Sequence, residues 1–382
     1  MSPLPVVLPW PAVRILLDYR PALRERTGVG EYAHQLAVAL TRLLPPDDQL
    51  MLFSSSWKDR LPSDRVPGAR AIDVRIPVRV LNAAWHRVGW PPVERFAGRI
   101  DVAHSMHPLV MPARRAARIV TVHDLDFLDH PERTRAEIRR DYAPLASAHA
   151  QRADTVVAVS GFTASEVERR LGVARDRIVI VSSGAPAWTP RTGQPVRGPI
   201  LFMGTLEPRK NVGVLLDAYR LLLDRVPDAP PLWLAGGASE AAAPWLRAIE
   251  QPPLAGRVVH LGYVIAERRY ELYRQASMLV LPSHLEGFGI PVLEAMTAGV
   301  PVVVSTGGAL PEVVGDAASA IPPDDAGGFA TAMARYLTDP AAVASAVEKG
   351  LARSREYSWD ASARTLLQVY KDAIARRQIR RH

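Results

Sequence analysis

Short apolar runs recur along this chain and alternate with longer amphipathic stretches. Runs typical of buried strands cover residues 12–18, 49–54, 71–76, 101–105, 119–124, 155–160 and 178–181 in the first half. In the second half they cover residues 200–204, 232–237, 258–261, 277–281 and 300–304. Strands that helices cover on both faces are nearly continuous in apolar residues, and their alternation with helical patterns is typical of βα units. The pattern predicts an α/β protein of two Rossmann-like, doubly wound domains with a cleft between them.

The periodicity breaks between the two halves. Residues 185–199 contain four prolines and two glycines, a composition typical of a linker. A length of 382 residues also favours two or three domains. We therefore predict a first domain over residues 1–190, a second over residues 191–360, and a final helix over residues 361–382 that packs back on the first.

Composition excludes only a few classes of protein and of binding site. The absence of cysteine excludes disulfides and thiolate metal sites and is compatible with a reducing cytosol. No apolar run reaches the length of about 18 residues typical of a spanning helix, and the opening Met1 to Trp10 lacks the basic leader of a signal peptide. The net charge of +8 could indicate an anionic partner. However, only 4 of the 47 basic residues are lysine, so this charge partly reflects an arginine-rich composition.

The stretch from Ser283 to Pro301 suggests chemistry most directly. A buried strand precedes it, Gly287 and Gly289 allow a tight turn, and Pro291 suits the first turn of a helix. A helix N-terminus presents unpaired N–H groups and partial positive charge. The loop from Gly287 to Ile290 is therefore predicted to bind a phosphate or diphosphate.

Two carboxylates, Glu286 and Glu294, flank that predicted anion site. A carboxylate beside a diphosphate is unfavourable unless it accepts hydrogen bonds from hydroxyl groups at either end of the ligand. A nucleotide-sugar supplies such hydroxyls, with ribose at one end and a hexose at the other. An ordinary strand-turn-helix unit is the alternative interpretation.

Two further strand-helix turns offer groups for an anion. Gly204 ends a strand and is followed by Arg209 and Lys210, two cations that could neutralise a departing diphosphate. A solvated charge pair is the alternative there. In the first half, Gly28-Val29-Gly30 lies between a strand and a helix, a pattern that also fits a plain glycine turn.

The run Glu286-Gly287-Phe288-Gly289-Ile290-Pro291, with Glu294-Ala295-Met296 and Gly299-Val300-Pro301, resembles the Glu-x7-Glu motif of the retaining nucleotide-sugar glycosyltransferases of family 4. These enzymes have the GT-B architecture, in which two Rossmann-like domains face each other across the active-site cleft. The resemblance covers nearly the whole chain and is densest over residues 200–316. It implies transfer of a hexose from a nucleotide diphosphate to an acceptor hydroxyl.

The resemblance also implies residue roles. His123, with Asp124, would lie beside the transferred hexose, although a histidine at a strand end can equally be structural. The residues expected to be catalytic are His123, Glu286, Arg209 and Lys210. The residues expected to bind the donor are Gly30, Gly204, Arg209, Lys210, Gly236, Tyr263, Val264, Glu286, Gly287, Phe288, Gly289, Ile290 and Glu294.

The pattern favours no metal and no cofactor beyond the nucleotide-sugar. Asp124-Leu125-Asp126 is formally Asp-x-Asp, but the resemblance assigns this region to the sugar. GDP-mannose is the expected donor, because the first half is most similar to bacterial mannosyltransferases and related hexosyltransferases of polysaccharide or glycolipid assembly. A sugar phosphorylase, a nucleotide-sugar epimerase and a non-catalytic binding module remain alternatives, and no nucleic acid is expected.

The acceptor, a glycan or a lipid-linked molecule, would lie in the first domain. Aromatic and basic residues alternate there between Trp85 and Phe96, a pattern that fits either a membrane interface or core packing. Further basic clusters lie at Arg114, Arg115 and Arg118 and between Arg133 and Arg140. We therefore expect a cytoplasmic protein, with peripheral contact to the anionic inner face of the membrane as a further prediction.

Overall fold

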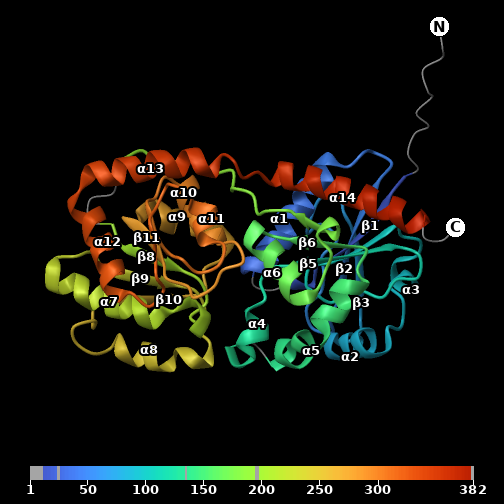
Figure 1. Ribbon diagram of the computed structural model, residues 1–382, viewed down its shortest axis with the longest axis horizontal. Helices are drawn as coiled ribbons and strands as arrows, with labels where there is room; N and C mark the ends of the chain where they lie inside the picture. The colour runs from blue at the N-terminus through green and yellow to red at the C-terminus, as the bar shows by residue number, and fades with distance from the viewer. Residues whose placement is uncertain (1–11, 24–25, 134–135, 194–197, 380–382) are drawn as a thin grey trace, which may run out of the picture.

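The computed structural model describes residues 12–23, 26–133, 136–193 and 198–379. The segment from Met1 to Trp10, Arg135 and the side chain of Arg133 lie outside this described part. The described chain forms two halves, each built on one parallel sheet with helices on both faces (Figure 1). Two Rossmann-like, doubly wound domains are therefore present, as the apolar pattern predicts.

The first sheet has seven strands in the order β3-β2-β1-β4-β5-β6-β7, all parallel. Its strands are β1 (Arg14–Asp18), β2 (Gln49–Ser55), β3 (Arg70–Val74), β4 (Val102–Ser105), β5 (Ala117–Val122), β6 (Thr155–Ala158) and β7 (Ile178–Ile180). Its helices are α1 (Gly28–Leu43), α2 (Val78–Ala83), α3 (Glu94–Ala97), α4 (Asp126–Asp129), α5 (Ala136–Arg152) and α6 (Gly161–Leu171).

The second sheet has six parallel strands in the order β10-β9-β8-β11-β12-β13. Its strands are β8 (Ile200–Met203), β9 (Leu232–Ala235), β10 (Val258–Gly262), β11 (Met278–Leu281), β12 (Val302–Ser305) and β13 (Ala320–Ile321). Its helices are α7 (Val212–Arg225), α8 (Ala243–Ala248), α9 (Ala266–Gln275), α10 (Ile290–Thr297), α11 (Leu310–Val314), α12 (Ala326–Thr338) and α13 (Pro340–Ser354).

The order of strands in each sheet defines where a ligand can bind. The order reverses between β1 and β4 in the first sheet and between β8 and β11 in the second. At such a point the connections leave in opposite directions and open a crevice at the carboxyl ends of the strands. The motifs that begin at Gly204 and Ser283 follow β8 and β11 directly, so the fold brings them to one crevice.

The last helix, α14 (Trp359–Ile379), lies along the first half (Figure 1). It packs against α1 and β5, and the Tyr370 hydroxyl lies 2.8 Å from Nδ1 of the buried His104. The other ring nitrogen of His104 lies 2.8 Å from the hydroxyl of Thr121. His104 therefore ties the final helix to the first sheet.

The segment between Trp85 and Phe96 does not expose all its aromatic residues. Trp85 is 1% exposed and donates its indole N–H to the Pro91 carbonyl, so its core-packing interpretation is correct. Trp90, by contrast, is 62% exposed. Among the residues that the structure describes, no helix has both the length and the apolar character to cross a bilayer.

Candidate active site

Lys210 and Arg209 meet Glu286 at the crevice between β8 and β11. The Lys210 ammonium donates to one carboxylate oxygen of Glu286 at 2.6 Å, and the Arg209 guanidinium donates to the other at 3.3 Å. Arg209 also donates to the Leu285 carbonyl at 2.9 Å, which fixes its head against the same loop. Two residues from one turn and one from another thus form a single charged cluster, a contact that the separate motifs did not predict.

Glu286 is ionised at neutral pH. Its burial by itself would raise the pKa of this carboxyl, but Lys210 and Arg209 outweigh that effect and hold the pKa at about 2. The Ser283 hydroxyl also donates to Glu286 at 2.6 Å. Glu286 is therefore a carboxylate that can only accept hydrogen bonds, as recognition of sugar hydroxyls requires.

The glycine loop after β11 touches the first half. A side chain at Gly287 would place its Cβ 1.6 Å from the backbone carbonyl oxygen of His123, so only glycine fits this contact. The Thr163 hydroxyl lies 3.2 Å from the carbonyl oxygens of both Gly287 and His123. Gly289 adopts a φ of +102°, a left-handed conformation that favours glycine, and precedes the first turn of α10.

His123 lies at this contact with one ring nitrogen unused. The Tyr32 ring meets the imidazole edge-on at 5.1 Å, and Nε2 of His123 is buried without a hydrogen-bond partner in the described chain. Burial lowers the pKa of His123 to about 4, so the ring is neutral at physiological pH. A neutral imidazole can donate a hydrogen bond to a ligand or accept one from it, but it supplies no positive charge.

Asp124 and Asp126 follow β5 beside the same cluster. Asp124 lies 3.9 Å from Arg209, and Asp126 is buried at the start of α4. Burial by itself would lower the pKa of Arg209, but Glu286, and after it Asp124, Glu207 and Asp126, raise this pKa, so Arg209 stays charged. Within the described residues, no group of three or more acidic or histidine side chains is arranged to hold a metal ion.

Glu294 lies on α10 and forms a second charged group. One of its carboxylate oxygens accepts from Arg269 at 2.7 Å and the other from the Tyr273 hydroxyl at 2.9 Å. Burial raises the pKa of Glu294 to about 7, although Arg269 and Tyr273 act in the opposite direction. The two acids of the motif therefore differ in charge state, since Glu286 titrates far below neutrality and Glu294 close to it.

Two of the other predicted glycines are needed for close backbone packing. A Cβ at Gly236 would lie 1.9 Å from the Gly204 carbonyl oxygen, and one at Gly30 would lie 2.5 Å from that of Pro21. The side chain of Lys210 passes beside Gly204, 3.6 Å from the position of a Cβ there. Gly204 and Gly236 thus lie next to the Lys210 cluster. Their contact with a donor, and that of Gly30, stays a prediction.

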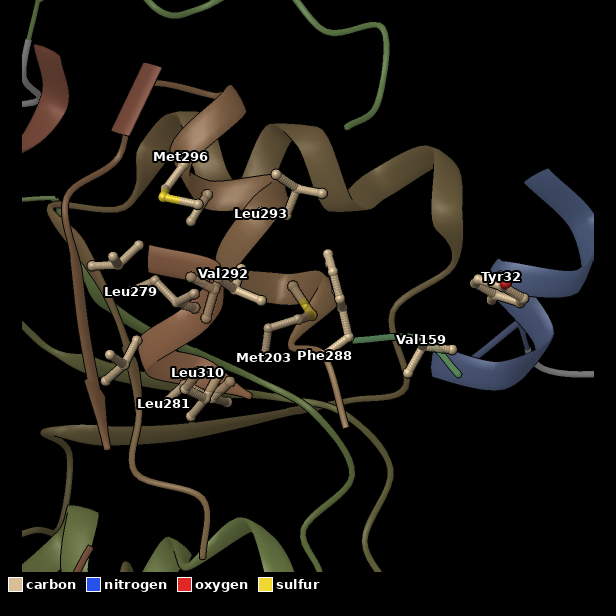
Figure 2. Packing of buried hydrophobic residues seen from close by; sticks show 14 of the residues in the cluster. Tyr32, Val159, Met203, Leu279, Leu281, Phe288, Val292, Leu293, Met296 and Leu310 are labelled. Atoms are coloured by element: carbon tan, nitrogen blue, oxygen red, sulfur yellow. The ribbon is translucent and has the colours of Figure 1, made fainter. Parts of the chain in front are cut away.

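The remaining predicted residues lie at the carboxyl edge of the second sheet. Phe288 is buried against Met203 and Val292, and its ring meets Tyr357 edge-on at 5.4 Å (Figure 2). Its side chain is therefore part of the core, and its predicted contact with the donor, through the backbone, stays a prediction. Ile290 begins α10 and is partly buried, whereas Tyr263 and Val264 lie between β10 and α9.

Sequence reasoning missed Arg269, Tyr273 and Thr163 as parts of this site. Arg269 and Tyr273 are four residues apart on α9, so both side chains reach Glu294 from one helix face. That spacing was visible in the sequence, but nothing local identified Glu294 as their partner. Glu312 makes another contact between the halves, where its carboxylate accepts from the backbone N–H groups of Gly161 and Phe162 at 2.9 and 3.0 Å.

Comparison with known proteins assigns the class of this site. The family model described as Glycosyltransferase Family 4 matches residues 26–187, and that described as Glycosyl transferases group 1 matches residues 197–339. The first match covers β2 to β7 of the first sheet, and the second covers β8 to β13, the whole second sheet. The chain belongs to the glycosyltransferases of family 4 and is an enzyme of GT-B architecture.

Individual relatives also support the assignment to the glycosyltransferases. The chain is 29% identical to O-antigen chain mannosyltransferase B of Escherichia coli over 94% of this chain and 100% of that protein. It is 30% identical to a D-inositol 3-phosphate glycosyltransferase of Xylanimonas cellulosilytica over 77% of this chain and 71% of that one. Sucrose-phosphate synthase of Thermosynechococcus elongatus shares the fold, with a TM-score of 0.76, 21% identity, and coverage of 95% of this chain and 99% of that one. The protein is thus a glycosyltransferase of glycan biosynthesis that resembles bacterial mannosyltransferases.

Proposed function

We propose that the protein transfers mannose from GDP-mannose, with retention of the anomeric configuration, to a hydroxyl group of a glycan acceptor. The joint placement of Lys210, Arg209 and Glu286 at the carboxyl ends of β8 and β11 supports the nucleotide-sugar part of this proposal most strongly. The choice of mannose and of a glycan acceptor rests on the full-length similarity to an O-antigen chain mannosyltransferase.

The donor would bind with its diphosphate beside the two cations and the N-terminus of α10. Lys210 and Arg209 already lie near the crevice, so they can meet negative charge as it develops on the departing diphosphate without a large rearrangement. Glu286 would then exchange its ion pairs for hydrogen bonds from hexose hydroxyls. Glu294 would accept hydrogen bonds from the ribose while it keeps its ion pair with Arg269.

His123 would contact the transferred hexose. Its neutral ring and its unpartnered Nε2 suit a hydrogen bond with a hydroxyl group, and its position beside Gly287 places it next to Glu286. We assign it no role as a nucleophile or as a cation. Metal-independent transfer is also part of the proposal, with Arg209 and Lys210 neutralising the diphosphate.

A panel of sugar nucleotides tests the donor. Thermal unfolding in the presence of GDP-mannose, UDP-glucose, UDP-N-acetylglucosamine and ADP-glucose should show stabilisation by GDP-mannose above the others. A ligand at 100 times its dissociation constant stabilises the folded state by about 2.7 kcal/mol. Stabilisation by a different sugar nucleotide would reject GDP-mannose while leaving glycosyl transfer intact.

Product analysis tests the reaction itself. Release of GDP that depends on an acceptor glycan would exclude an epimerase, a phosphorylase and a binding module together. Proton NMR of the product should show the anomeric configuration of the donor, and an inverted product would refute retention. Activity should persist after treatment with EDTA, and a requirement for Mg²⁺ or Mn²⁺ would refute metal independence.

We further propose that the first half attaches to an anionic membrane. Residues 74–93 contain no acidic residue and carry three arginines. Val88 and Trp90 are 76% and 62% exposed, and they line a hollow of about 320 Å³ together with Arg114, Arg118 and Arg152. Apolar side chains beside cations fit the headgroup region of an anionic bilayer.

A further inference from the structure

Arg269 connects the two halves of the molecule through two carboxylates. Its guanidinium lies 2.8 Å from Glu31 on α1 and 2.7 Å from Glu294 on α10. The arginine side chain is 12% exposed, and those of Glu31 and Glu294 are 6% and 5% exposed. Three ionisable side chains from three helices therefore share one largely buried site.

The two carboxylates lie at functionally distinct places. Glu31 directly follows Gly30 in the glycine loop of the first half, and Glu294 is the second acid of the motif in the second half. Each carboxylate has a second partner besides Arg269: Gln35 donates to Glu31 at 2.7 Å, and Tyr273 donates to Glu294 at 2.9 Å. Arg269 is thus the residue common to both groups, and it spans the interface between the two sheets.

The guanidinium also keeps unused hydrogen-bonding capacity. Its Nε is buried and has no hydrogen-bond partner within the described chain. A buried donor without a partner is unfavourable by itself, so a ligand atom that accepts from it would relieve that cost. Ribose and phosphate oxygens are acceptors that a nucleotide-sugar brings to this place.

We propose that Arg269 is a positioning residue for the nucleotide-sugar, which orients the carboxylate of Glu294 toward the ribose and, through Glu31, holds the first half closed over the donor. This proposal rests on the proposed function, since it takes the ribose to be the partner of Glu294. Replacing Arg269 leaves two buried carboxylates facing each other without their shared cation, which favours separation of the halves. Replacing Glu31 removes its contact with Arg269 across the interface, together with a longer 4.0 Å ion pair to Arg26, and leaves the pair at Glu294 in place.

Three variants separate these two effects. Arg269→Met should weaken binding of GDP and lower kcat for GDP-mannose, each by about 5- to 150-fold, the usual range of coupling between two sites. Glu31→Gln should leave GDP affinity unchanged and lower kcat. Arg269→Lys should recover part of the GDP affinity, but not the full kcat, because an ammonium cannot hold two carboxylates in the planar geometry of a guanidinium.

The control is Arg268→Met, an exposed arginine adjacent on the same helix, which should match the unmodified protein. GDP binding is measured by calorimetry, steady-state kinetics give kcat and KM, and thermal unfolding confirms that each variant is folded. The proposal is overturned if Glu31→Gln weakens GDP as much as Arg269→Met does, or if both variants lose thermal stability while kcat and KM stay unchanged. If the unmodified protein binds GDP but uses no nucleotide-sugar, the proposed function fails on its own, and equal GDP affinity of Arg269→Met and the unmodified protein would still refute the role of Arg269.

Discussion

The charge of Lys210 should contribute directly to the rate of transfer. We consider Lys210→Met, which removes the ammonium but keeps a side chain of similar length that can pack beside Gly204. The ammonium lies 2.6 Å from Glu286 and the lysine side chain is 12% exposed, so its charge is largely shielded from solvent. A cation in such a place is already oriented toward the charge that forms on the leaving diphosphate.

The expected loss in kcat is about 10²- to 10³-fold, or roughly 2.7–4 kcal/mol, as for removal of one preorganised group that stabilises developing charge. Arg209 remains 3.3 Å from Glu286, so some stabilisation should persist. The Lys210→Met substitution should also change the pKa of Glu286 in the enzyme without substrate. Without the nearer cation, burial should raise the pKa of Glu286 above its present value of about 2.

Steady-state kinetics with GDP-mannose and an acceptor glycan measure this loss as kcat and kcat/KM. Lys349→Met is the matched control, because Lys349 forms a partly exposed ion pair with Asp316 in the same half. Exposed pairs contribute little, so this control should retain both the rate and the stability of the unmodified protein. A Lys210→Met enzyme with full kcat, or one with only a raised KM, would refute the role in leaving-group stabilisation.

The other predictions follow from the same geometry. Glu294→Ala should weaken GDP-mannose and GDP alike, whereas Glu286→Ala should weaken only GDP-mannose, and calorimetry showing equal losses for both ligands in both variants would reject the assignment. Burial raises the pKa of the Glu294 carboxyl, which faces Arg269, Tyr273 and Glu31, to about 7. GDP affinity should therefore rise as the pH increases through 7, and this pH dependence should be absent from Glu294→Gln. If the pH dependence persists in the variant, it belongs to another group. His123→Ala should lower kcat with little change in GDP affinity, and because the pKa of His123 is about 4, no rate step near pH 6.5 should depend on it; an unchanged kcat would make His123 structural. Trp90→Ala should reduce co-sedimentation with anionic vesicles, while Ile265→Ala, a similarly exposed apolar change in the second half, should not; absence of binding at low salt by the unmodified protein would refute attachment.

The strand pattern predicted most of the fold because each buried parallel strand is itself a short apolar run. Strand β13, however, has only two residues, Ala320–Ile321, and no periodicity can be recognised over such a length. The interleaved aromatic stretch was ambiguous for a different reason. Trp85 and Trp90 look alike in sequence, and only packing against Phe53 and Arg20 shows that Trp85 is the buried one.

The motif around Glu286 could be identified from sequence because its glycines, proline and acids are close together in the chain. Its ion pair with Lys210 was not predicted, because the two strand-helix turns were each interpreted only for their contact with a ligand. The charge states of the two acids could not be predicted either. Glu286 and Glu294 have the same chemistry, and only their neighbours make one strongly acidic and raise the pKa of the other to about 7.

By itself, the sequence determined the βα order, the division into two halves and the family, because these depend on local periodicity and on residues near one another in the chain. The tertiary structure decided which distant groups meet. Arg269 lies 238 residues after Glu31 and 25 before Glu294, and no local pattern joins the three. Their contact exists because two separately folded sheets bring α1, α9 and α10 together, and a buried charge is tolerated only where such partners surround it.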